Sequence, residues 1–312
     1  MISPRVSVLI PTYRYAGYLR EAIDSVLAQD FADFELLVSD DCSGDGSAAI
    51  LREYAERDAR VLVNIHPANV GMVQNWNWCL GHARGEFVKF IFGDDMLARP
   101  DALRKMVAMH DAHPEAALSA SARNVIDEKS RTVAAWSHLG DSGVHTSGDT
   151  MFRCLAEGNM IGEPTAVMFR RSAASRGFSE SYRQMVDLEM WLHLLGHGPL
   201  VYTAEPLCAF RRHPLQQTEV NKETDVHSSE IIRLILDYGE SRLMKGRDMR
   251  GTSFRRLYRT RKAAAGNPVI AAAREQLLDR LGRTSYRMRW LGKKLSNPFT
   301  ALARCLRKTK QP

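Results

Sequence analysis

VSVLIPTYRYAGYLREAIDSVLAQDFADFELLVSDD, residues 6–41, indicates the fold class of this 312-residue chain. Its first five residues are apolar apart from one serine, and Phe34–Ser39 is a second apolar run. Between these runs, Leu19, Ile23 and Val26 recur at the spacing of one helix face. A buried strand, a helix and another buried strand form a βαβ unit, so the two strands are predicted to pair in parallel.

The same alternation continues to residue 92. Helical patterns at 47–58 and 73–83 separate predicted strands at 61–65 and 87–92. Crossovers of this kind are right-handed and place helices on both faces of a sheet. We therefore expect an α/β fold with a mostly parallel, twisted, Rossmann-like sheet flanked by helices.

Beyond Pro100 the alternation weakens. A helix at about 100–110 precedes a predicted hairpin with its turn near 127–130, and 141–148 reads as a polar loop. The remaining segments have clear patterns: AVMFRR is a predicted strand, DLEMWLHLLG a helix, LVYT and PLCAFRR two short strands, and the chain from about Ser228 onward is helical.

Composition narrows the class of protein. Hydrophobic residues make up 45% and charged residues 25%, which is typical of a globular protein. The five cysteines are scattered, with no CxxC pair, so we expect neither a disulfide framework nor a structural zinc site, and a cytoplasmic location. We find no cleavable signal pattern and no apolar run of about 20 residues.

Charge is concentrated at one end of the chain. Residues 280–312 contain ten Lys or Arg and no Asp or Glu, which leaves 33 basic and 36 acidic residues elsewhere. Short amphipathic patterns in this segment are typical of helices that lie on an anionic membrane surface. A basic helix packed on the domain is the alternative, and nucleic acid is not expected as a partner.

Polar loops follow the four predicted strands. They are PTYRY (11–15), DDCSGDGS (40–47), HPANVG (66–71) and GDDM (93–96). Because ligands bind at the carboxyl ends of parallel strands, these loops are expected to form one site. Neither GxxxxGK[ST] nor GxGxxG follows the first strand, which argues against a P-loop NTPase and a dinucleotide dehydrogenase.

Taken together, VSVLIPTYR, FELLVSDDCSGDGS, NVGMVQNWN, GEFVKFIFGDD, VDLEMWLHLL and AFRRHP resemble glycosyltransferase family 2, over roughly residues 4–217. The resemblance implies the GT-A fold and transfer of a sugar from a nucleotide-diphospho-sugar. It also implies a catalytic domain at 1–220, with a donor half at 1–100 and an acceptor half at 101–220. Residues 221–312 would then be a helical, basic extension.

The resemblance assigns the donor loops. It implies that Pro11, Thr12, Tyr13, Asp40, Asp41, Asn75 and Asp94 bind the nucleotide. A carboxylate accepting from a uracil N–H, beside a stacked ring, is sensible chemistry for a UDP-sugar.

The pair Asp94 and Asp95 corresponds to the family's DXD sequence. The resemblance implies that Asp94 faces the ribose and that Asp95 binds a divalent metal, with Asp94 and His213 close to the metal. Mg²⁺ and Mn²⁺ both suit oxygen ligands, and the sequence does not choose between them. Phe92 stands where many relatives carry a further acid.

On the acceptor side, Asp187 matches the family's general base, and Glu189 is the competing candidate. Glu163, Thr165, Glu189 and Arg211 are predicted to line the sugar or acceptor pocket. The acceptor would be a glycan, a lipid-linked molecule or a small molecule, at the inner face of a membrane if the basic tail binds lipid. Two alternatives remain open: a sugar-nucleotide nucleotidyltransferase and a non-catalytic nucleotide-sugar-binding protein with a basic docking tail.

Overall fold

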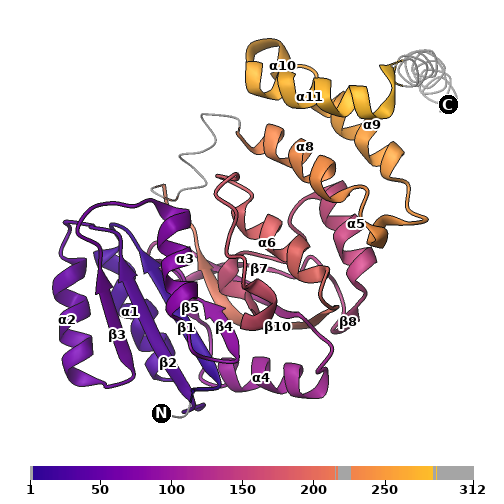
Figure 1. The fold of residues 1–312 in the computed structure, drawn as a ribbon. Helices are drawn as coiled ribbons and strands as arrows, with labels where there is room; N and C mark the ends of the chain where they lie inside the picture. The colour runs from indigo at the N-terminus through magenta and orange to yellow at the C-terminus, as the bar shows by residue number, and fades with distance from the viewer. Residues whose placement is uncertain (1–2, 215, 217–225, 284–285, 287–312) are drawn as a thin grey trace, which may run out of the picture.

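The computed structural model describes residues 3–214, 216, 226–283 and 286. In that part of the chain one ten-stranded sheet runs through the molecule, in the order β3-β2-β1-β4-β9-β6-β10-β5, with β7 beside β6 and β8 beside β10 (Figure 1). The strands are β1 (Val6–Thr12), β2 (Phe34–Asp40), β3 (Val61–Ile65), β4 (Phe87–Phe90), β5 (Met96–Leu97), β6 (Leu118–Ile126), β7 (Thr132–Trp136), β8 (Gly143–His145), β9 (Val167–Arg170) and β10 (Leu200–Arg211).

Helices cover both faces of the sheet. They are α1 (Ala16–Leu27), α2 (Ser47–Arg57), α3 (Met72–His82), α4 (Ala102–Ala112), α5 (Ser147–Glu157), α6 (Val186–Leu195), α8 (Val226–Tyr238), α9 (Met249–Arg259), α10 (Ala263–Gly266) and α11 (Pro268–Leu281), with short 3₁₀ turns η1 (Pro164–Ala166), η2 (Arg171–Ala174) and η3 (Arg242–Met244). Neighbouring strand residues face opposite sides. Leu9 packs with α3, α5, α6 and α8 in one core, whereas Val8 and Ile10 pack with α1, α2 and α4 in the other.

The parallel part of the sheet confirms the predicted fold class. Strand β1 pairs in parallel with both β2 and β4, and β2 pairs in parallel with β3. The carboxyl ends of these strands therefore open at one edge of the sheet. Strand β9 joins the two halves by pairing antiparallel with β4 and with β6.

Strand β10 brings distant residues to that edge. It runs parallel to β6, and Cys208 and Ala209 pair antiparallel with β5, directly after the acidic pair at 94–95. The turn containing Asp94 therefore lies beside the end of β10, more than a hundred residues later in the chain.

Some predicted elements were wrong in extent. The two short strands expected at LVYT and PLCAFRR are one strand, β10, with irregular register between Thr203 and Cys208. Pro206 occupies that irregular stretch, where the missing N–H is tolerated. The expected polar loop at 141–148 contains β8 and the start of α5, because this short segment pairs with β10. The fourth strand ends at Phe90, and α4 spans Ala102–Ala112.

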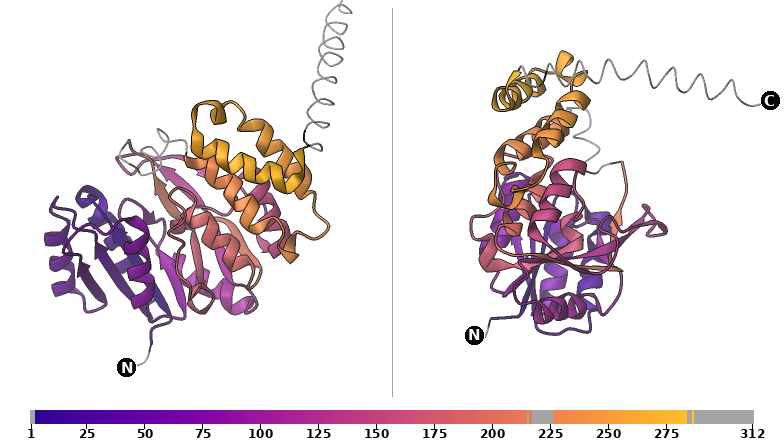
Figure 2. Two further views of the ribbon diagram at one scale, coloured as in Figure 1. Left: turned by 45° about the horizontal axis from the view of Figure 1, so that its top comes forward. Right: turned by 90° about the vertical axis from the view of Figure 1, so that its right-hand side faces the viewer.

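The helices after residue 225 do not form a separate core. Ile231, Ile232 and Leu234 of α8 are buried in the same cluster as Trp191 of α6. Figures 1 and 2 show α8 against the α/β body, while α10 and α11 lie further out at one end. None of the helices in the described part combines the length and the apolar character needed to cross a membrane. The predicted tail helices at 287–312 lie outside the described residues.

Candidate active site

The acidic pair lies in the turn after β4. Asp95 is 1% exposed, and each of its carboxylate oxygens has a protein partner. Oδ1 accepts from the Arg211 backbone N–H at 2.8 Å, and Oδ2 accepts from the Thr165 hydroxyl at 2.5 Å. Burial, and then the neighbouring charge of Asp94, holds the pKa of the Asp95 carboxyl well above its usual range.

Asp94 points to a different set of groups. Its Oδ2 lies 3.0 Å from Nε2 of His213, which is itself buried. Burial, and then the charge of Asp94, raise the pKa of the Tyr15 hydroxyl. The rings of Tyr15 and Tyr18 lie 5.8 and 5.2 Å from the His213 ring, so His213 is held on two sides.

Gly93 allows the first and fourth loops to meet. A Cβ atom at Gly93 would lie 2.6 Å from Oγ1 of Thr12 and 3.2 Å from the Tyr15 ring. Only a residue without a side chain permits this approach. The buried Thr12 Oγ1 has no hydrogen-bond partner within the described chain.

The first loop carries an aromatic ring that is exposed to solvent. Tyr13 is 39% exposed, and the Arg14 guanidinium lies 5.0 Å from its ring centroid. Arg14 has a φ of 60° and donates its backbone N–H to the Ser43 hydroxyl at 2.8 Å, which ties the two loops together. Pro11 is buried at the end of β1.

The two acids at the start of the second loop accept hydrogen bonds from backbone N–H groups. Asp41 accepts from the N–H groups of Val70 at 2.6 Å and Gly71 at 2.9 Å, and Asp40 accepts from the N–H and hydroxyl of Ser43. Both acids are buried. Asn75 is also buried and donates to the Ser39 carbonyl at 3.1 Å, while its Oδ1 lacks a partner among the described residues.

Asp187 lies in the first turn of α6. Its Oδ2 accepts from the Asn159 amide at 3.0 Å, and Oδ1 accepts from the Leu188 N–H at 2.7 Å. Burial, aided by the charge of Glu163, raises the pKa of Asp187 to about 7. A carboxyl with this pKa can exchange a proton near neutral pH.

Glu163 connects the two halves of the site. It forms an ion pair with the buried Arg123, and its charge raises the pKa of both Asp187 and Asp95. Glu163 lies in the segment 159–165, which contacts both parts of the site. Asn159 donates to Asp187 at one end of this segment, and Thr165 donates to Asp95 at the other.

Three residues predicted for the sugar or acceptor pocket have structural partners instead. The Thr165 hydroxyl binds Asp95, and Thr165 is 1% exposed. Glu189 binds Arg176 at 2.8 Å and the Tyr238 hydroxyl, which leaves it poorly placed as an alternative base. Arg211 is fully buried, and its guanidinium binds protein oxygens, including Glu21 at 2.6 Å.

Sequence reasoning missed Tyr15, Asn159 and Lys89. Tyr15 stands inside the quoted PTYRY loop, and Lys89 interrupts an otherwise apolar strand, so both had a visible signal. Lys89 is fully buried and donates to the backbone carbonyls of Thr165 and Val167. Asn159 had no signal, because its role depends on the turn that brings it to α6.

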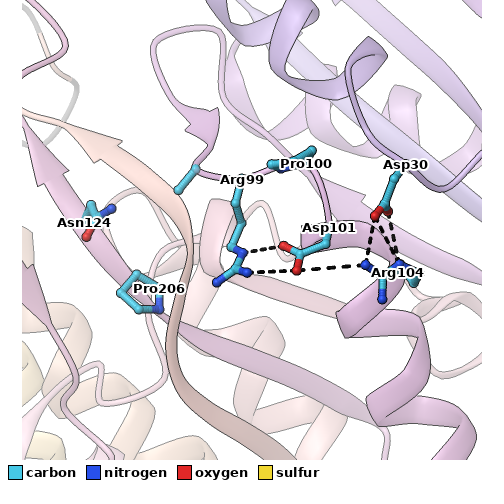
Figure 3. A pocket seen from close by; sticks show the side chains of 8 residues that line it. Asp30, Arg99, Pro100, Asp101, Arg104, Asn124 and Pro206 are labelled. Carbon is cyan, nitrogen blue, oxygen red and sulfur yellow. Dashed lines mark hydrogen bonds and ion pairs between the residues drawn. The ribbon is translucent and has the colours of Figure 1, made fainter.

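A separate pocket of about 530 Å³ lies beside the turn between β5 and α4 (Figure 3). Its arginines already pair with carboxylates: Arg104 binds Asp30 at 2.8 Å, and Arg99 binds Asp101. The pocket's lining contains none of the predicted site residues in the described chain. Its charges are satisfied within the protein, and it adds nothing to the site.

Two neighbouring side chains at the acidic turn carry atoms of the kind that ligate divalent metals. Across the described ranges, no three His, Cys, Asp or Glu side chains come together as a complete metal site. Asp94 and His213 do offer a carboxylate oxygen and an imidazole nitrogen, both buried and adjacent. Mg²⁺ and similar ions are commonly held by one or two protein groups plus substrate phosphates. The donor set therefore fits a divalent ion that binds together with a diphosphate.

The chain belongs to glycosyl transferase family 2, whose model matches residues 7–178. Over 221 residues it is 33% identical to the uncharacterized protein MT1568 of Mycobacterium tuberculosis, covering 67% of each chain. Membership of this family makes the protein a glycosyltransferase that uses a nucleotide-sugar.

Solved structures share the fold. S. aureus TarS 1-349 in complex with UDP-GlcNAc aligns with a TM-score of 0.61 at 19% identity, over 90% of this chain and 74% of that one. The mannosyltransferase PcManGT from Pyrobaculum calidifontis, in complex with GDP-Man and Mn²⁺, aligns with a TM-score of 0.56 at 18% identity, over 92% and 83%. These likenesses establish the GT-A fold.

Proposed function

We propose that the protein is a metal-dependent inverting glycosyltransferase that uses a UDP-sugar. The acceptor would be a hydroxyl of a glycan, a lipid-linked molecule or a small molecule. The observation that carries the proposal is that the segment 159–165 contacts two parts of the site, through Asn159 and Thr165. One is the buried acidic turn with its histidine, and the other is Asp187, whose pKa of about 7 suits proton transfer.

The proposed donor site lies at the ends of β1 and β2. The exposed ring of Tyr13 is available to stack on the nucleotide base, and Thr12 and Asn75 offer buried oxygens that have no partner among the residues the structure describes. Pro11, Asp40 and Asp41 hold the loops around them, and Asp41 remains our candidate acceptor for the base N–H. The complex of TarS with UDP-GlcNAc supports uridine as the base.

The contacts of Asp94 and Asp95 favour roles for these two acids that differ from the roles expected from the sequence. Both oxygens of Asp95 are already bound by Arg211 and Thr165, whereas Asp94 faces His213. We therefore assign the metal to Asp94 and His213, and a supporting role to Asp95. A divalent ion bound there would offset the charge that develops on the departing diphosphate. The Mn²⁺ complex of PcManGT supports such an ion.

The proton moves at Asp187. Its carboxylate accepts the proton of the acceptor hydroxyl while that oxygen attacks the anomeric carbon, and the bond between that carbon and the diphosphate oxygen breaks. Asn159 holds the carboxylate in place by donating to Oδ2. Attack opposite the leaving group inverts the anomeric configuration.

A thermal-shift experiment tests the donor site. We expect UDP with Mn²⁺ to raise Tm by about 5 °C at a hundredfold excess over Kd, because ligands of the native state stabilise it. Asp94→Asn should remove the part of the shift that needs Mn²⁺. Asp101→Asn, in the separate pocket, is the matched control. An equal Mn²⁺-dependent shift in Asp94→Asn would contradict the metal assignment, and a larger shift with GDP would contradict uridine.

We also propose that the C-terminal part binds an anionic membrane surface. Arg255, Arg259, Arg261 and Lys262 are exposed on α9 and the turn to α10, and no acid pairs with them in the described part of the chain. This basic surface precedes the tail at 281–312, which continues the same charge. Helices α10 and α11 lie at the outer end of the molecule (Figure 1).

A further inference from the structure

Helix α8 supplies a carboxylate to the loop that precedes Asp187. Glu230 accepts three backbone N–H groups: Arg183 at 2.6 Å through Oε1, and Gln184 at 2.9 Å and Met185 at 2.8 Å through Oε2. Glu230 is 7% exposed, so these bonds are shielded from water. One side chain therefore satisfies three consecutive backbone donors.

Those donors stand at the start of α6. Met185 occupies the N-cap position of α6, and its side chain makes no capping bond. The first N–H groups of any helix need an outside acceptor, and a negative charge there is favoured by the helix dipole. Of the three bonds, the one from Met185 belongs to the helix end, and the other two hold the preceding residues 183 and 184. Glu230 supplies this acceptor and charge from 45 residues beyond Met185.

Asp187 is the second residue of α6, so the first turn sets its position. Its Oδ1 bond to the Leu188 N–H keeps the carboxylate on that turn. A shift of the turn would move Asp187 away from Asn159, which holds its other oxygen from a separate element. The position of Asp187 as the proposed base therefore depends on the residue at which α6 begins.

Two more residues of α8 reach the same region. The Asp237 carboxylate accepts from the Tyr182 hydroxyl at 2.5 Å, and the Tyr238 hydroxyl donates to Glu189. Residues 230, 237 and 238 lie on one face of a helix. Helix α8 thus holds the loop before α6 and α6 itself, while its apolar side chains enter the core.

We propose that Glu230 is a positioning residue for the catalytic base, so that the helices after residue 225 are part of the catalytic apparatus. The proposal rests on the role assigned to Asp187. Glu230 acts through the backbone of 183–185 and touches neither donor nor acceptor.

The test compares Glu230→Gln with Tyr182→Phe in the full chain. Glu230→Gln keeps the size of the side chain but places an amide donor against backbone donors. Tyr182→Phe removes a bond between α8 and the same loop without altering the three N–H groups. We expect Glu230→Gln to lower kcat at least tenfold, with donor KM and the Tm shift by UDP and Mn²⁺ unchanged within twofold. Tyr182→Phe should keep kcat within twofold.

A double variant separates positioning from general stability. If Glu230 acts through Asp187, Glu230→Gln should have no further effect on the residual rate of Asp187→Asn. Equal kcat losses in Glu230→Gln and Tyr182→Phe, or full kcat in Glu230→Gln, would overturn the proposal. Glu230→Asp, which keeps the charge on a shorter side chain, should fall between wild type and Glu230→Gln. If Asp187→Asn alone kept full transfer, the base assignment itself would fail.

Discussion

At the scale of single residues, Asp187 is the most informative position. Its pKa of about 7 means that the ionised, proton-accepting form appears only as pH rises through neutrality. We expect kcat/KM for transfer to rise about tenfold per pH unit below 7 and to level off above it. Asp187→Asn should lower kcat by roughly 10²–10⁴ and flatten this profile, as measured by release of the nucleotide diphosphate.

The same residue links pH to folding. Native Asp187 keeps its proton to a higher pH than an unfolded aspartate, whose pKa is about 3.9. The native state therefore loses stability as pH rises from about 4 to about 7. Asp187→Asn should melt at a higher temperature than the wild type at pH 8, with a smaller gap at pH 5. Asp149→Asn, an exposed first-turn acid of α5, is the control and should leave transfer unchanged. A Tm difference between Asp187→Asn and wild type that does not change with pH would contradict the raised pKa of Asp187.

Residue roles could be predicted from the sequence only in part. The loops that carry Asp94, Tyr13 and Asp187 were identifiable because each follows or begins an element with a clear pattern. The contacts of Arg211 could not be predicted from the sequence, because β10 places its guanidinium among oxygens from distant parts of the chain. Sequence spacing does not report such contacts.

At the scale of elements, β4 contains an exception to its own apolar pattern. Lys89 is fully buried, burial lowers the pKa of Lys89 to about 8, and its amine donates to the Thr165 carbonyl. Thr165 in turn orients Asp95. Phe92, which stands where relatives carry an acid, lies 4.9 Å from the Trp76 ring and belongs to the core.

We expect Lys89→Met to separate stability from activity. An apolar side chain of similar length should hold or raise Tm at pH 7, since the lowered pKa of Lys89 corresponds to a cost on the order of 3 kcal/mol for burying its charge. That cost disappears as pH rises from about 8 to about 10, so the Tm advantage over wild type should shrink there. Transfer should fall about tenfold, because Thr165 loses the donor to its carbonyl.

Thermal melts at pH 7 and pH 10, together with initial rates of sugar transfer, test this prediction for Lys89→Met. Lys105→Met, which removes a half-buried lysine from the ion pair with Glu205, is the matched control and should show neither effect. A fall in Tm together with activity at pH 7 would show that Lys89 serves the fold alone.

Element prediction succeeded where the pattern was local. Two apolar runs identified β1 and β2, the period of 3.6 residues identified α1, and a buried parallel pairing followed from them. Strand β8 has three residues, and its pairing with β10 depends on chain that arrives more than fifty residues later. A strand this short forms only because it pairs with another strand, so the local sequence period does not predict it.

At the scale of the whole molecule, the distribution of charge distinguishes the two ends. The catalytic edge of the sheet gathers carboxylates, whereas α9 and the turn to α10 expose Arg255, Arg259, Arg261 and Lys262. The sequence placed the basic character in the tail beyond residue 280. The structure shows that a basic surface, without acidic partners among the described residues, begins before it, on a helix that also carries the buried Leu257.

We expect this surface to bind vesicles that contain phosphatidylglycerol and to ignore vesicles of phosphatidylcholine alone. Each basic residue near an anionic surface contributes about 1 kcal/mol, so replacing all four by Gln should weaken co-sedimentation by roughly two orders of magnitude or more at low salt. Deleting 287–312 should weaken it further, since that segment adds basic residues.

The matched control replaces Arg57, Arg104 and Arg131, exposed arginines that already pair with acids elsewhere on the molecule. It should leave vesicle binding unchanged, because those charges are neutralised by their partners. The four-residue variant should retain its Tm and its transfer to a water-soluble acceptor, because Arg255 and Arg261 bond only within their own segment, to Thr252 and Tyr258, in the described chain. Vesicle binding that persists in the four-residue variant and in the deletion alike would show that the membrane is not the partner of this end of the protein.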